Sequence, residues 1–150
     1  MEKETKKDNV KLAVIRVRGV TGVKYDIDLT IKKLGLSRKN HCVVVPKNES
    51  YFGMIKKAGD YVTWGEINEE MYSALIEKRG EEFTGRTSDK KGKISYNKFI
   101  DVNAKKIKKI FRLNSPKKGY GRKGVKFSFV NGGALGYRGD KINDLIKRMI

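Results

Sequence analysis

The side chains best suited to chemistry in this chain are cations that lie beside glycines and aromatic rings. Residues 102–126 contain ten Lys and Arg and no acid. Tyr120 and Tyr137 each neighbour a glycine and lie close in sequence to Arg122 and Arg138, respectively. Aromatic rings stack on unpaired bases, and Lys and Arg pair with phosphates. A lysine-rich run alone usually marks a solvated surface, so it is this combination that favours nucleic-acid binding.

Residues 119–124 have the G-x-G-x-x-G spacing of dinucleotide-binding loops. That motif functions between a strand and a helix, in a βαβ unit with an acid about 20 residues further on. Here the glycines follow Pro116 and lead into an extended segment, and no such unit joins them to Asp140. We therefore expect no dinucleotide cofactor. We interpret the segment as a flexible basic loop in which glycine lets the backbone approach phosphates closely.

Side chains that could perform catalysis are few. Glu66, Glu69 and Glu70 form an acidic cluster, but the helix dipole accounts for carboxylates in the first turn of a helix. His41 is the only histidine and Cys42 the only cysteine. Because neighbouring strand residues point to opposite faces, these two do not form a nucleophile pair. His41 is equally compatible with a residue that simply begins a strand and with an RNA contact. We expect no catalysis, no metal and no cofactor.

The overall charge also indicates a polyanionic partner. Thirty-five Lys and Arg against 17 Asp and Glu give the 150-residue chain a net charge of +18. So large a surplus opposes compaction unless a polyanion neutralises it, and nucleic acid does so with release of counterions. No run approaches the ~18 apolar residues of a membrane span, and the polar start does not resemble a secretory signal. A single cysteine fits a reducing cytoplasm.

The elements that must position these residues begin with a core that we place at residues 11–66, after a polar tail at 1–10. Strands rich in β-branched residues are predicted at 11–18, 41–45 and 61–64. Helical apolar spacing fills the two intervals between them. The caps expected for the first helix are Asp26 and Gly35, and those for the second are Asn48 and Gly59. The predicted order is β-α-β-α-β.

Residues 67–150 are expected to form a basic, mainly helical C-terminal extension. A third helix is predicted from Asn68 to Gly80, where glycine would end it in the left-handed conformation. A basic loop at 81–93 follows. The last helix is predicted to begin after Asp140.

Between these two helices, the most basic part of the chain is predicted to contain a further helix. Ala104, Ile107, Ile110 and Phe111 have helical spacing, and lysines occupy the positions between them. That pattern predicts an amphipathic helix with a cationic outer face. Residues 117–124 are expected to be a basic loop, and residues 125–130 a strand or extended segment.

The order and spacing of several motifs resemble the large-subunit ribosomal protein L-thirty family, in its long archaeal form with eukaryotic L-seven relatives. The motifs are AVIRVRG at 13–19, LGLSRKNH at 34–41, GMI at 53–55, VTWGE at 62–66, LIEKRG at 75–80 and GGALGYRG at 132–139. Together they extend from about Lys11 to the C-terminus.

The resemblance implies a fold and a set of partners. It implies an α+β fold in which a three-stranded antiparallel sheet carries two helices on one face, a two-layer, ferredoxin-like half. It also implies a non-enzymatic role in translation, in the large subunit of the cytoplasmic ribosome. The implied partners are the main large-subunit rRNA, 5S rRNA nearby and neighbouring ribosomal proteins. No membrane and no small-molecule substrate is implied.

Family motif positions and the basic loops together define the candidate RNA-binding residues. The resemblance carries over Arg38 and His41 as RNA contacts. The full set is Arg16, Arg18, Arg38, Lys39, His41, Arg86, Lys105, Arg112, Lys117, Lys118, Tyr120, Arg122, Lys123, Tyr137 and Arg138. The main alternative is a free-standing basic RNA chaperone or a nucleic-acid-packaging protein. An enzyme acting on nucleic acid is a further alternative, for which the sequence offers no clustered ligands.

Overall fold

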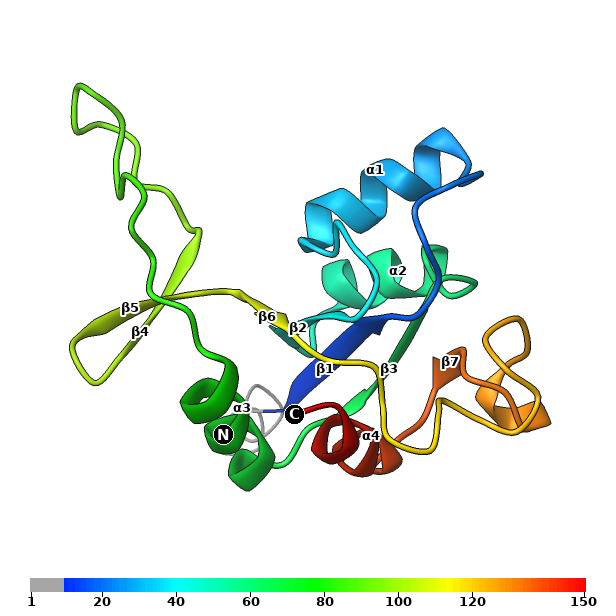
Figure 1. Cartoon of the computed structure of the whole chain (residues 1–150). Coiled ribbons are helices and arrows are strands. Elements are labelled where there is room, and N and C mark those ends of the chain that lie inside the picture. The colour runs from blue at the N-terminus through cyan, green and yellow to red at the C-terminus, as the bar shows by residue number, and fades with distance from the viewer. Residues whose placement is uncertain (1–9) are drawn as a thin grey trace, which may run out of the picture.

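A mixed five-stranded sheet lies at the centre of the computed structural model, which describes residues 10–150 (Figure 1). The polar tail predicted at 1–10 falls outside the described residues except for Val10. The sheet order is β6-β2-β1-β3-β7. Central β1 (Lys11–Arg16) pairs antiparallel with both β2 (His41–Pro46) and β3 (Val62–Glu66). The expected α+β class is confirmed.

Two helices cover one face of the sheet (Figure 1). They are α1 (Tyr25–Leu34), between β1 and β2, and α2 (Glu49–Lys57), between β2 and β3. Their apolar side chains pack on Leu12 and Val14, which alternate along β1 and so point to the same face. Gly35 ends α1 in the left-handed conformation, as predicted. The N-cap of α1 is Lys24, not Asp26, which lies in the first turn.

Helices of the extension cover the opposite face of the sheet. The structure therefore has three layers where two were predicted. α3 (Glu69–Arg79) and α4 (Lys141–Met149) pack there against Ala13 and Ile15 of β1. Asn68 and Asp140 are the N-caps of these helices, as predicted. Gly80 follows α3 in an extended conformation, so the expected left-handed C-cap is wrong at that position. Because both faces are buried, the four inner positions of β1, from Leu12 to Ile15, are all apolar.

The helix predicted over residues 104–112 is wrong. This region forms the hairpin of β4 (Phe99–Val102) and β5 (Lys105–Lys108), followed by β6 (Ile110–Arg112), so the extension is not mainly helical. Asn103 and Ala104 both have positive φ, which suits a two-residue hairpin turn. We call residues 81–109 the arm; it projects away from the sheet (Figure 1). β6 then returns to the sheet and pairs with β2.

The remaining segment, residues 113–140, packs along the end and far edge of the sheet. Residues 125–130 form no strand; they form turns leading into a short 3₁₀ helix at Phe129–Asn131. β7 (Gly136–Tyr137) then pairs in parallel with β3. Glu66 ends β3 and does not belong to the first turn of α3, which contains Glu69 and Glu70.

Candidate nucleic-acid interface

The turn before β2 and the chain after β6 lie side by side at one end of the sheet. Their first link is the pairing of His41 with Arg112 across β2 and β6. Asn40 supplies the others: its carbonyl oxygen accepts the Leu113 N–H, and its side-chain amide donates to Ser115 Oγ at 3.3 Å. The Tyr120 hydroxyl donates to Asn40 Oδ1. A single asparagine therefore joins two segments that lie more than 70 residues apart in sequence.

We name residues 37–41 and 112–123 the two-loop surface. These residues include seven Lys and Arg and no acid. All seven side chains are exposed, and they are Arg38, Lys39, Arg112, Lys117, Lys118, Arg122 and Lys123. The structure therefore brings two of the basic segments singled out in the sequence next to each other.

His41 lies inside this positive field. Its ring is half-buried, and its Nδ1 atom is buried without a hydrogen-bond partner. Burial lowers the pKa of His41, and the nearby charges of Arg112, Arg38 and Arg16 lower it further, against a smaller opposing effect of Glu81. His41 is therefore held neutral by its surroundings.

Two candidate arginines are buried and donate their hydrogen bonds to other groups of the protein. Arg16 is 1% exposed, and its guanidinium donates to the carbonyls of Leu36, Arg18 and Gly19 at 2.8, 3.0 and 3.0 Å. Arg138 is 6% exposed and donates to Thr63 Oγ1 and to two backbone carbonyls. Burial lowers the pKa of Arg138 to about 10, so it remains charged at neutral pH. Both arginines hold loops in place from within.

The two candidate tyrosines also have protein partners. Tyr120 is half-buried between two apolar clusters, and burial raises its pKa to about 12. Tyr137 lies on β7, at the far edge of the sheet, and its hydroxyl donates to Glu66 at 2.6 Å. That hydrogen bond raises the pKa of Tyr137 to about 12. Tyr137 is 51% exposed, so its side chain is partly accessible to a partner.

Arg18, Arg86 and Lys105 lie outside the two segments that define the two-loop surface. Arg18 follows β1, with its guanidinium over the Tyr61 ring at 5.1 Å. Arg86 and Lys105 are exposed on the arm. Arg112 links the arm to the surface, because its Nε lies 3.5 Å from Glu81 Oε1.

Glycines shape the loop that carries the G-x-G-x-x-G spacing. Gly119 has a φ of +76°, which favours glycine. At Gly121, a Cβ atom would lie 2.5 Å from the carbonyl oxygen of Gly133, so glycine is needed for the two loops to pack. The motif is thus explained by loop conformation and protein packing.

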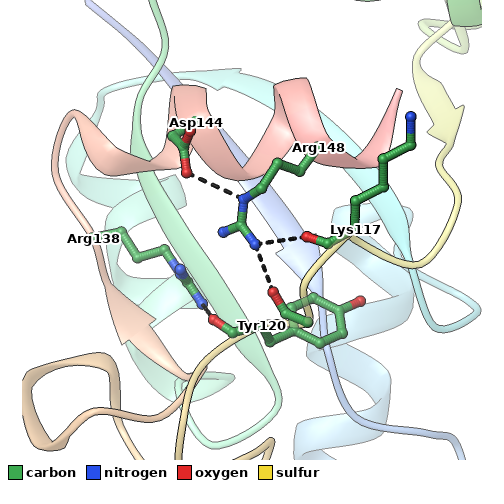
Figure 2. Close-up of polar contacts among 6 residues, drawn as sticks. Lys117, Tyr120, Arg138, Asp144 and Arg148 are labelled. Carbon is green, nitrogen blue, oxygen red and sulfur yellow. Dashed lines mark hydrogen bonds and ion pairs between the residues drawn. The ribbon is translucent and has the colours of Figure 1, made fainter.

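Two side chains in this region were not identified from the sequence. Asn40 joins the two segments, and Arg148 of α4 contacts the 117–120 backbone (Figure 2). Asn40 has a φ of +65°, and an asparagine within a basic turn is the only sequence signal of its role.

Among residues 10–150, no group of three or more His, Cys, Asp or Glu could hold a metal ion. In the same range, no helix is long and apolar enough to cross a membrane.

Comparison with known proteins identifies the family. Residues 12–62 match the model of ribosomal protein L30p/L7e. The chain is 48% identical to large ribosomal subunit protein uL30 of Methanococcus vannielii, over 92% of this chain and 98% of the relative. It is 46% identical to the uL30 protein of Nanoarchaeum equitans, over 92% of this chain and 97% of that relative. It is 40% identical to the uL30 protein of Methanopyrus kandleri, over 89% of this chain and 100% of that relative. The resemblance noted in the motifs is confirmed, and the chain belongs to the ribosomal protein L30p/L7e family.

Proposed function

We propose that this chain is a structural, non-enzymatic constituent of the large subunit of the cytoplasmic ribosome, and that it binds large-subunit rRNA. Membership of the family supports the ribosomal role, since the relatives are named large ribosomal subunit protein uL30. The observation that carries the RNA proposal is the two-loop surface, where Asn40 joins two basic, acid-free segments.

The proposed mode of binding follows from the types of side chain on this surface. Lysines act as point charges, and arginines can pair with phosphate through two N–H groups at once. Such contacts recognise the shape and charge of the RNA backbone more than its sequence. Arg38, Lys39, Lys117, Lys118, Arg122 and Lys123 are proposed to make them. His41, neutral and half-buried between cations, is proposed to contact RNA at the centre of the surface.

Arg16 and Arg138 are proposed to support the surface without touching RNA, because protein carbonyls already accept their hydrogen bonds. Arg18 and Tyr137 are proposed as peripheral contacts. A separate RNA contact is proposed for the arm, through Arg86 and Lys105. We propose 5S rRNA, which the family resemblance implies is nearby, or a neighbouring ribosomal protein as partners of the remaining surfaces. We further propose a division into a core at 11–66 and an extension at 67–150.

A pair of matched double variants tests the RNA proposal. Arg38→Ala with Lys39→Ala removes two charges from the two-loop surface, whereas Lys56→Ala with Lys57→Ala removes two exposed charges from α2. Affinity for a large-subunit rRNA fragment is measured as a function of salt. The first variant should lose affinity and lower the log–log salt slope by about 0.7 to 0.9 for each phosphate contact removed. Equal losses in both variants would show that only overall charge matters.

Sedimentation separates the ribosomal role from a free RNA chaperone. A constituent of the subunit should follow large subunits through high-salt washes, whereas a chaperone should be removed by them. The Arg38→Ala and Lys39→Ala variant should be removed at lower salt than the unmodified chain.

A further inference from the structure

The backbone of residues 117–120 is held by an arginine that projects from the last turn of α4. Arg148 Nη1 donates to the carbonyl oxygens of Lys117 and Gly119 at 3.0 and 2.7 Å. Its Nε donates to Asp144 Oδ2 at 3.1 Å, which fixes the orientation of the guanidinium (Figure 2). The Arg148 side chain is only 26% exposed. Most of the side chain is therefore covered, and its Nη1 atom is directed at the loop.

The loop in turn completes the end of the helix. The N–H of Lys117 donates to the Arg148 carbonyl at 3.1 Å, and the N–H of Asn114 donates to the Met149 carbonyl at 3.0 Å. The last carbonyls of a helix lack partners within it, so these bonds satisfy groups that would otherwise need water. Helix end and loop thus stabilise one another in both directions.

A second arginine fixes the other end of the same segment. Arg138 Nη2 donates to the Tyr120 carbonyl at 3.0 Å (Figure 2). The Tyr120 hydroxyl donates to Asn40 Oδ1. Within four residues, the backbone oxygens of positions 117, 119 and 120 are thus all taken up by guanidinium groups.

The loop conformation itself requires such support. Lys118 has a φ of +67° and is followed by Gly119 at +76°. A lysine in the left-handed region is strained and persists where surrounding contacts over-determine it. The carbonyls are bound by the two arginines while the side chains of Lys117 and Lys118 stay exposed. The contacts therefore select one backbone shape that leaves both cations on the surface.

We propose that Arg148 is a positioning residue for RNA binding: it holds residues 117–120 in the shape in which Lys117 and Lys118 meet phosphates, without contacting RNA itself. This inference rests on the proposed function of the two-loop surface. A loop that is ordered before binding loses less conformational entropy on binding, so preorganisation raises affinity without adding a contact.

Salt titrations distinguish a positioning residue from a phosphate contact. Arg148→Ala should weaken binding to the rRNA fragment roughly tenfold and leave the log–log salt slope unchanged, because every phosphate contact is still made in the complex. Lys117→Ala, which removes a proposed contact, should lower the slope by about 0.7 to 0.9. Lys147→Ala, an exposed neighbour on α4, is the control for charge loss. The inference is overturned if Arg148→Ala behaves like either Lys117→Ala or Lys147→Ala.

Amide hydrogen exchange in the RNA-free protein tests the same inference independently of RNA. In Arg148→Ala, the amides of Lys117 and Gly119, which donate to Arg148 and Pro116, should exchange faster while those of β1 remain protected. Unchanged exchange would refute the positioning role even if RNA binds as proposed. Faster exchange with no salt-dependent RNA binding by the unmodified chain would instead refute the proposed function. If Arg148→Ala fails to fold, Asp144→Ala keeps the cation and should show the same two effects at smaller size; their absence counts against the inference.

Discussion

At the scale of single residues, arginines of the same sequence type have different surroundings. Arg16 and Arg38 both lie within residues 12–62, which match the family model, and the sequence predicts both as RNA contacts. Arg16 is enclosed by three carbonyls, whereas Arg38 is exposed on the two-loop surface. A buried guanidinium with satisfied donors stabilises the fold, and an exposed one is available to a partner. Substitution should therefore separate the two roles.

We expect Arg16→Lys to lower the free energy of unfolding by about 2 kcal/mol or more. A lysine keeps the charge but cannot reach carbonyls on both sides of the strand end, and each buried carbonyl left without a donor costs about 1–3 kcal/mol. Urea denaturation measures the change. Arg38→Lys, the matched control, should change the free energy of unfolding by less than about 0.5 kcal/mol. Unchanged stability of Arg16→Lys with weakened RNA binding would restore Arg16 as an RNA contact.

The only histidine should make folding sensitive to pH. Because the pKa of His41 is lowered in the folded protein, the unfolded chain binds a proton first as the pH falls. The contribution of His41 to the free energy of unfolding should be fully present above the ordinary histidine pKa of about 6.5. It should decrease as the pH drops from there toward the lowered pKa. Urea denaturation at several pH values between 7.5 and 5.5 measures this, and His41→Gln should remove the decrease. The same pH dependence in both proteins would contradict it.

At the scale of secondary-structure elements, local signals explain which parts could be predicted. In the core, β-branched runs and Gly35 at the end of α1 agree with one another, and the structure has the predicted order of elements. The C-cap of α2 is Ala58, so the prediction of Gly59 there is wrong by one residue. In the arm, the spacing of Ala104, Ile107 and Ile110 fits a helix, yet Asn103 and Ala104 make a tight turn. Neither residue is glycine, the usual signal for such a turn, so the pattern favoured the wrong element.

The basic segments of the candidate interface could be predicted from the sequence, but their contact in the folded chain could not. Basic residues at 38–39 and 117–123 stand out in the sequence, but nothing local connects them. Their contact depends on the pairing of β2 with β6 and on Asn40, which bonds to Tyr120 across 80 positions. The burial of Arg16 and Arg138 likewise depends on loops that converge only in the folded chain.

The tip of the arm should be dispensable for folding. Phe83 N and Lys106 O lie 2.8 Å apart, so two glycines can replace residues 84–105 with little strain. None of those residues belongs to or packs against the apolar core clusters. We expect cooperative unfolding and a Tm within a few degrees of the intact chain, measured by calorimetry. Loss of the cooperative transition would assign the arm to the core.

At the scale of the whole molecule, the positive charge lies almost entirely outside the buried core. The buried set contains only two charged side chains among residues 10–150, Arg16 and Arg138, so nearly all of the +18 charge lies at the surface. Like charges on one small domain repel, and this repulsion destabilises the compact state. Salt ions and RNA phosphates can both relieve it, but they compete with each other. Folding and RNA binding should therefore respond to salt in opposite directions.

Raising NaCl from 0.05 to 0.5 M should raise the Tm of the free protein by a few degrees, because the screening length falls well below the spacing of many surface charges. The same change should weaken RNA binding by orders of magnitude, since counterion release then contributes less. Calorimetry and fluorescence titration measure the two effects. Lys56→Glu with Lys57→Glu lowers the net charge by four outside the two-loop surface, and it should reduce the effect of salt on Tm while the salt slope for RNA stays the same. A Tm that falls with salt in both proteins would mean that ion pairs such as Lys47–Glu66 and Lys108–Glu81 outweigh the repulsion.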